Sequence, residues 1–113
     1  MRVIATRVFD RAAAKLLTQA ERETAEAALV ARPDAWPVIP GSGGARKARI
    51  ARGGQGKRGG ARVIYFYSPA PGLLALLALY AKNEKETLTH ADLQAIRAAI
   101  AAIRAAVRDD ATR

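Results

Sequence analysis

The sequence predicts an α+β fold, in which a small antiparallel β-sheet carries packed helices and the elements follow the order β-α-α-β-β-β-α. Segments with helical spacing of apolar residues lie towards both ends of the chain, and three strand-like segments with short connections lie between them. Consecutive strands connected in this way form an antiparallel meander. Alanine is abundant and aromatic residues are only 5% of the chain, which favours helices over a wide β-sandwich. A length of 113 residues predicts one domain, spanning residues 1–113.

The N-terminal third is expected to hold a short strand and two helices. Apolar residues indicate the opening strand: Val3, Ile4 and Val8. Asp10 is suited to cap a first helix over residues 11–17. The sequence from Thr18 to Glu21 has the capping-box pattern, which predicts a second helix that stops before Pro33.

The central part is expected to form the meander. Prolines and glycines predict a loop over residues 37–44, and residues 46–51 then alternate weakly, as a strand does. Residues 53–60 are rich in glycine and predict a hairpin loop. Residues 61–67 are rich in β-branched and aromatic side chains and predict the second strand. The apolar run at residues 73–81 predicts a third, central strand.

A long helix is expected to close the fold, from a cap at Thr89 to about Asp109. Its apolar side chains recur at helical spacing: Leu93, Ile96, Ile100, Ile103 and Val107. We expect the helices to cover one face of the sheet and to leave the other face free for basic residues.

The positive charge of the chain belongs to one segment. No acidic residue lies between Asp34 and Glu84, and eight basic residues do: Arg46, Lys47, Arg49, Arg52, Lys57, Arg58, Arg62 and Lys82. The formal net charge is +9, and the rest of the chain is near balance, with eleven basic against ten acidic residues. A basic segment without acids is suited to bind phosphates.

The glycine-rich stretch at residues 53–58 is not a nucleotide-binding phosphate loop. That motif requires glycine where Ala51 stands and serine or threonine where Arg58 stands. A mobile loop with phosphate-binding cations is the better interpretation. Four cations are expected to contact a nucleic-acid backbone: Arg46, Arg52, Lys57 and Arg58.

The composition excludes the common metal sites. The chain has no cysteine, and its one histidine, His90, begins the last helix, where a surface role is expected. The acid-free central span has no carboxylates to hold magnesium. We therefore expect no metal and no cofactor. Any cleavage of a phosphodiester would depend on lysine, arginine and tyrosine, with Tyr80 the best-placed tyrosine because it shares a strand face with Lys82.

Three segments carry motifs in a specific order and spacing: IPGSGGARKAR at residues 39–49, GKRGGARVIY at 56–65 and LYAKNEKE at 79–86. Together they resemble the RelE/HigB toxins of bacterial type II toxin–antitoxin modules, in particular the HigB-like branch. The resemblance implies the RelE/ParE toxin-like fold and an endoribonuclease that cuts messenger RNA in the ribosomal A site. It implies cleavage without metal, by attack of the RNA 2′-OH on the adjacent phosphate. It also implies a cognate antitoxin, expected to be a small HigA-like helix-turn-helix protein.

The resemblance also assigns site residues. Arg62 matches the arginine that opens the family's GxRxxY strand, Lys47 and Arg49 match the basic pair on the preceding strand, and Lys82 matches the lysine that ends the last strand. With Tyr80, these five residues are the expected catalytic set. A cation close to a pentacoordinate phosphate stabilises its developing charge.

Two departures from the family pattern leave the general acid and base open. Asn83 stands where some members have a second arginine, and no tyrosine or histidine except His90 follows Tyr80. Because cationic neighbours favour the neutral form of a lysine, three lysines are candidates for the base: Lys47, Lys57 and Lys82.

The sequence leaves two other functions open. A non-catalytic RNA- or DNA-binding module would need the same cations as a nuclease. A ParE-like toxin that poisons gyrase would need no nuclease residues, so the basic strand residues favour the nuclease. The first ten residues lack the apolar run of a signal peptide, and the run at residues 73–81 is too short to cross a membrane. We therefore expect a cytoplasmic protein with no membrane partner.

Overall fold

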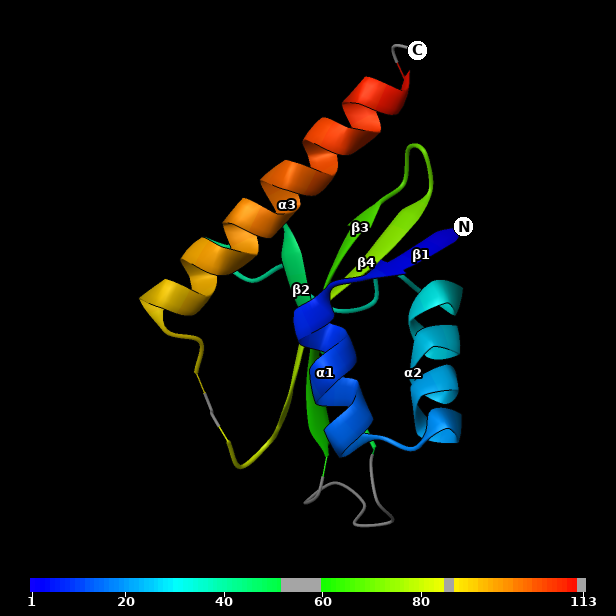
Figure 1. The fold of residues 1–113 in the computed structure, drawn as a ribbon, viewed down its shortest axis with the longest axis vertical. Helices are drawn as coiled ribbons and strands as arrows, with labels where there is room; N and C mark the ends of the chain where they lie inside the picture. The colour runs from blue at the N-terminus through cyan, green and yellow to red at the C-terminus, as the bar shows by residue number, and fades with distance from the viewer. Residues whose placement is uncertain (52–59, 85–86, 112–113) are drawn as a thin grey trace.

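The computed structural model describes residues 1–51, 60–84 and 87–111 and contains the predicted sequence of elements (Figure 1). The elements are β1 (Arg2–Ala5), α1 (Arg7–Leu16), α2 (Gln19–Ala31), β2 (Ala45–Ile50), β3 (Ala61–Ser68), β4 (Leu73–Ala81) and α3 (His90–Ala111). The predicted α+β class and the order β-α-α-β-β-β-α are confirmed. The Gly-rich loop predicted at residues 53–60 lies, except for Gly60, outside the described residues.

The four strands form one mixed sheet in the order β1-β4-β3-β2. Strands β2, β3 and β4 make the predicted antiparallel meander. Strand β1 adds a pairing that local sequence patterns do not predict, because it runs parallel to β4, with Arg2 opposite Leu73. The helices α1 and α2 connect β1 to β2, so the chain crosses one face of the sheet before the meander begins.

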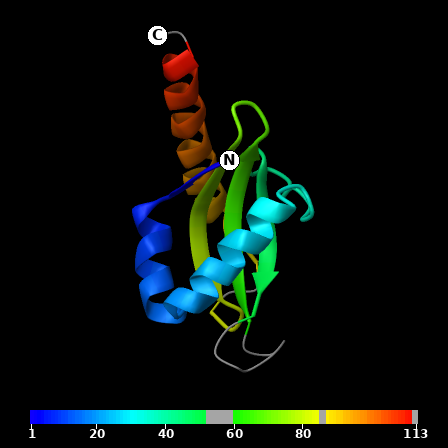
Figure 2. The same cartoon turned by 90° about the vertical axis from the view of Figure 1, so that its right-hand side faces the viewer.

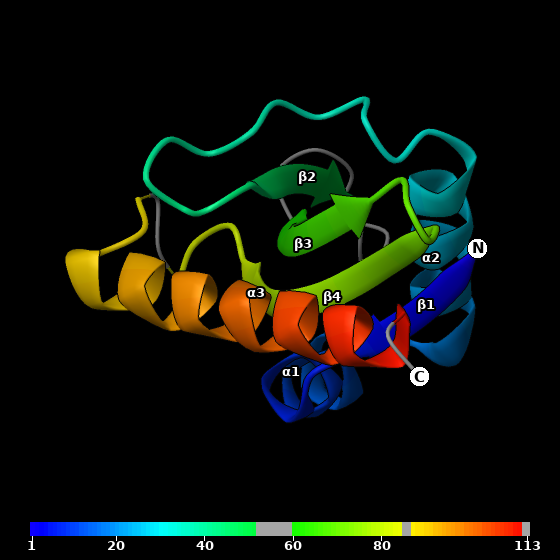
Figure 3. The same cartoon turned by 90° about the horizontal axis from the view of Figure 1, so that it is seen from above.

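Helices cover both faces of the sheet, so the expectation that they would cover one face was wrong. Helices α1 and α2 pack on one face, where Phe9 and Leu29 join a core cluster with Tyr65 of β3. Helix α3 packs on the other face, where Ile96 and Ile100 join a second cluster. Figure 2 shows α2 on the near side of the sheet and α3 on the far side, and Figure 3 shows the strands in order from β2 to β1. The physical reason is the composition of β3 and β4, which are apolar on both faces and must be covered on both.

The first helix begins earlier than predicted. Its N-cap is Thr6, whose hydroxyl accepts a hydrogen bond from the Phe9 N–H at 3.1 Å, and Asp10 lies within its first turn. Val8, predicted to be in the strand, is therefore helical. The strand ends before Thr6 and does not continue to Val8, because the Thr6 hydroxyl accepts a hydrogen bond from a backbone N–H that the first turn of a helix leaves without a partner.

The other two helix starts are confirmed. Thr18 and Glu21 form a capping box at the start of α2, and each side chain bonds the other residue's backbone N–H. Thr89 and Asp92 make the same reciprocal pair of bonds at the start of α3. These exchanges are local in sequence, which is why the sequence predicts them well.

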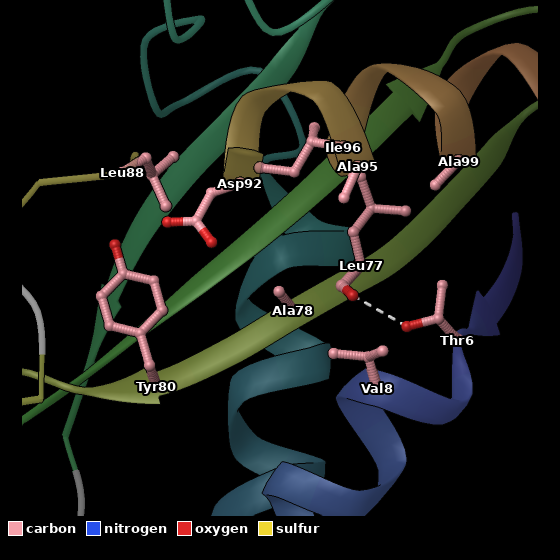
Figure 4. A pocket seen from close by; sticks show the side chains of 10 residues that line it. All are labelled: Thr6, Val8, Leu77, Ala78, Tyr80, Leu88, Asp92, Ala95, Ile96 and Ala99. Carbon is pink, nitrogen blue, oxygen red and sulfur yellow. Dashed lines mark hydrogen bonds between the residues drawn. The ribbon is translucent and has the colours of Figure 1, made fainter. Parts of the chain in front are cut away.

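A bulge in β4 links the sheet to α1. Ile64 lies opposite Ala78 and Tyr65 lies opposite Leu76, so Leu77 is the extra residue on β4. The Leu77 carbonyl accepts a hydrogen bond from the Thr6 hydroxyl at 2.8 Å (Figure 4). The same hydroxyl thus caps a helix and bonds the irregular position of the sheet.

The loop before β2 closes around a buried serine. The Ser42 hydroxyl donates to the Ile39 carbonyl at 2.6 Å and accepts from the Ala45 N–H at 2.9 Å. Gly43 takes a φ of 80°, a conformation that side chains disfavour. From α3, Arg97 donates to the Gly41 carbonyl at 2.9 Å, so this loop also fixes the helix to the edge of the sheet.

Ser42→Ala is expected to reduce the free energy of unfolding by about 1–3 kcal/mol, because the buried Ala45 N–H would lose its acceptor. Urea unfolding followed by circular dichroism measures this loss. The matched control is Ser68→Ala, which removes a surface bond to the Ala70 carbonyl and should change stability by less than about 0.5 kcal/mol. Equal effects of the two substitutions would contradict the role given to Ser42.

Candidate nucleic-acid interface

Four of the predicted cations gather at one end of the sheet, on the face that carries α3. Arg49 of β2 lies directly opposite Arg62 of β3, and Arg62 lies directly opposite Tyr80 of β4. Directly opposite residues point to the same face, with their Cβ atoms about 4.5–5.5 Å apart. Lys47 is two residues before Arg49 and therefore shares that face.

Lys82 ends this arrangement just beyond β4. Its backbone N–H donates to the Gly60 carbonyl at 3.0 Å, which continues the pairing of β3 and β4 past Ala81. The Glu84 carboxylate accepts from the Ala81 N–H at 3.1 Å and fixes the turn that follows. We call Lys47, Arg49, Arg62 and Lys82 the basic row. The strand register and this backbone bond bring the four residues to one end of the sheet.

Among the described residues, the basic row has no compensating negative charge. None of its four members forms an ion pair with a carboxylate in the part of the chain that the structure describes; the ion pairs given there join Arg22 to Asp10 and to Glu26, on α1 and α2. Arg49 and Lys82 are exposed, and Lys47 and Arg62 are half-buried. Arg49 and Arg62 are directly opposite each other, and their like charges destabilise the fold. A bound anion would reduce this repulsion.

Tyr80 shares the face of the basic row but points away from it. Its side chain is 7% exposed and lines a hollow of about 210 Å³ with Leu88, Asp92 and Ile96. Figure 4 shows its ring directed from β4 towards the first turn of α3. The Tyr80 side chain therefore faces α3 and not the basic row (Figure 4).

Arg46 lies on the opposite face from the basic row. It pairs with Tyr65, and its guanidinium donates to the backbone carbonyls of Asp34, at 3.4 Å, and Trp36. Its bonding fixes the segment after α2 to the sheet. Three other cations predicted to bind a nucleic-acid backbone lie outside the described residues: Arg52, Lys57 and Arg58.

Tyr65 takes part in the same attachment. Its hydroxyl donates to the Pro33 carbonyl at 2.7 Å. Burial raises the pKa of this hydroxyl, and the nearby Arg46 acts in the opposite direction. The neutral hydroxyl is therefore the form that the folded protein holds, as its role as a donor requires.

Sequence reasoning did not single out Trp36. Its ring lies 5.9 Å from the guanidinium carbon of Arg49, which lies over it. Two sequence features could have indicated it, because Trp36 is the only tryptophan and lies in the acid-free span. Its contact with Arg49 is not encoded locally, since it depends on how the loop after α2 folds back along β2.

The remaining sequence-based expectations concern His90, metals and membranes. His90 is exposed at the start of α3, as predicted. Within residues 1–51, 60–84 and 87–111, no three or more histidine, cysteine or acidic residues gather as they would around a metal ion. Across the same ranges, no helix has the length and apolar character needed to span a bilayer.

The sequence of the chain matches a known protein family. Residues 1–112 match the family model of the RelE toxin of the RelE / RelB toxin–antitoxin system. The match covers every element of the described fold, including the strands that carry the basic row. A toxin of this kind has a cognate antitoxin as its partner. The chain therefore belongs to the RelE toxin family and is the toxin component of a toxin–antitoxin system.

Proposed function

We propose that this toxin is an endoribonuclease that cuts messenger RNA on the translating ribosome, in the cytoplasm. The observation that carries the proposal is the basic row, in which four cations share one end of a sheet without a carboxylate partner among the described residues. The RNA of a ribosomal site exposes many negatively charged phosphates, and the positive charge of the basic row is attracted to them.

The proposed reaction is attack of an RNA 2′-oxygen on the adjacent phosphorus, with loss of the 5′-oxygen of the next nucleotide. Negative charge grows on the non-bridging oxygens as the bond forms. We expect the planar guanidinium group of Arg62 to hold those oxygens, and Arg49, directly opposite Arg62 in the register, to add positive charge while its guanidinium lies over Trp36. Lys47 and Lys82 flank them and are candidates for the proton transfers.

Tyr80 receives a supporting role in this proposal. Its buried ring packs towards the first turn of α3, so it fixes β4, the strand next to Arg62, against that helix. Arg46 stabilises the segment behind the sheet and contributes to RNA binding only by its long-range charge.

The antitoxin is proposed to be a small HigA-like helix-turn-helix protein, as the HigB-like motifs of the sequence imply. Expression of the toxin alone is expected to arrest growth, and co-expression of the protein encoded next to it should restore growth and allow the two to be purified as a complex. A chain that is harmless alone and has no such partner would contradict the proposal.

Toeprinting on programmed ribosomes tests the reaction itself. New messenger RNA ends inside the A-site codon are the expected result. Occupied ribosomes without new ends would favour a non-catalytic RNA-binding module. Accumulation of cleaved DNA on gyrase, with intact messenger RNA, would favour a ParE-like toxin. Either of these outcomes would overturn the nuclease proposal.

A further inference from the structure

Trp36 is distinguished from the other aromatic residues by its exposure and its neighbour. Four of the six aromatic side chains are buried in the core: Phe9, Tyr65, Phe66 and Tyr80. Of the two that are partly exposed, Tyr67 packs on the cluster beneath α1 and α2, near the far end of β3. Trp36 packs on the same cluster but also lies under Arg49, a member of the basic row.

The segment that carries Trp36 is fixed to the sheet by two neighbouring side chains, Arg46 of β2 and Tyr65 of β3. Arg46 donates to the Trp36 carbonyl, and the Tyr65 hydroxyl donates to the Pro33 carbonyl at 2.7 Å. The ring itself packs against the core cluster beneath α1 and α2. The position of the ring is therefore determined before any ligand binds, which lowers the entropic cost of using it in recognition.

Arg49 presents its guanidinium to solvent above this ring. It is exposed, and its guanidinium carbon lies 5.9 Å from the centre of the Trp36 ring. A guanidinium plane and an aromatic ring both stack on nucleobases, and such stacking is how proteins commonly hold unpaired RNA. The next cation across the sheet is Arg62, directly opposite Arg49, where the adjacent phosphate would find a partner.

We propose that Arg49 and Trp36 form a platform on which one unpaired RNA base stacks, beside the cations that hold its phosphates. The inference rests on the proposed function and adds to it the residues that hold the base. A bare phosphate would need the charge of Arg49 but not the ring, and an acidic peptide would likewise pair with the cations alone. The ring beneath the guanidinium is the feature that favours a base.

Trp36 provides its own probe, because it is the only tryptophan. A hexanucleotide of 2′-O-methyl RNA lacks the attacking hydroxyl, so it reports binding without cleavage. We expect it to quench the Trp36 fluorescence on binding. Polyphosphate carries the charge without bases and is expected to bind the basic row with a much smaller fluorescence change. Equal changes with the two ligands would overturn the platform.

Two substitutions separate stacking from charge. Arg49→Lys keeps the charge and removes the plane, and Trp36→Leu keeps an apolar side chain and removes the ring. Each should weaken hexanucleotide binding about 5- to 100-fold, measured by the anisotropy of a labelled hexanucleotide, and leave polyphosphate binding unchanged. Thermal unfolding checks the fold, and Arg49→Lys decides the test if Trp36→Leu proves unstable.

The control is Arg104→Lys, because Arg104 lies over Phe66 at 5.0 Å and makes the same kind of contact elsewhere. It should bind the hexanucleotide as the parent does. Unchanged binding in both Arg49→Lys and Trp36→Leu would overturn the proposal, as would loss of antitoxin binding with RNA binding intact. A negative result for the platform does not affect the nuclease proposal, because the nuclease proposal is tested separately, by cleavage in the parent protein and in Arg62→Ala.

Discussion

Arg62→Ala is expected to lower the single-turnover rate of messenger RNA cleavage on programmed ribosomes by about 10²–10³-fold. Arg62 is the central member of the basic row, since it lies opposite Arg49 on one side and opposite Tyr80 on the other. Its guanidinium would meet charge that develops only in the transition state. The rate should fall even when the ribosome is saturated with toxin, and growth arrest in cells should be lost.

The matched control is Arg11→Ala, which removes the same charge from an exposed position on α1, beyond the opposite face of the sheet. It should cleave like the parent. Ribosome binding of both variants, measured by co-sedimentation, should change much less than the Arg62→Ala cleavage rate. If Arg62→Ala cleaves normally once its binding is saturated, the basic row serves only to dock the protein.

Thr6→Val is expected to reduce the free energy of unfolding by about 2–4 kcal/mol, although the two side chains have nearly the same shape. The substitution removes the cap of α1, worth about 1 kcal/mol, and leaves the buried Leu77 carbonyl without its partner, at a cost of about 1–3 kcal/mol. Urea unfolding monitored by circular dichroism and by Trp36 fluorescence measures the change.

Thr6→Ser is the control for this prediction, because it keeps the hydroxyl and loses only a methyl group. It should retain most of the stability. If Thr6→Val and Thr6→Ser are equally stable, the two hydrogen bonds of Thr6 contribute nothing beyond packing. Cleavage by the surviving folded fraction should be unchanged, since Thr6 does not contact the basic row.

The parts of the fold that the sequence predicted are those encoded by neighbouring residues. The capping pairs at Thr18 and Thr89 operate within three residues, and the meander follows from short connections between consecutive strands. The start of α1 was misplaced because its cap, Thr6, is followed by Arg7 and Val8, which continue the pattern of the strand. The choice of cap depends also on Leu77, which is 71 residues away.

The positions of the candidate residues in the fold were predictable to the same extent. Alternation along β2 places Lys47 and Arg49 on one face, and an antiparallel meander brings Arg62 beside them. The position of Arg46 on the opposite face follows from the same alternation. The sequence also contained the information that helices cover both faces of the sheet, because β4 is apolar at almost every position. The contact of Trp36 with Arg49 was not, since a loop conformation decides it.

The parallel pairing of β1 with β4 has a consequence for the order in which the protein folds. Strands β2 to β4 meet through short connections and lose little chain entropy when they associate. Strand β1 must wait for β4, with Arg2 opposite Leu73, so its pairing closes a much longer stretch of chain than any pairing within the meander. Contacts of such sequence separation form late and slow the overall folding rate. During synthesis, β1 leaves the ribosome before the meander but reaches its native place after it, so the basic row is assembled before the sheet that carries it is complete.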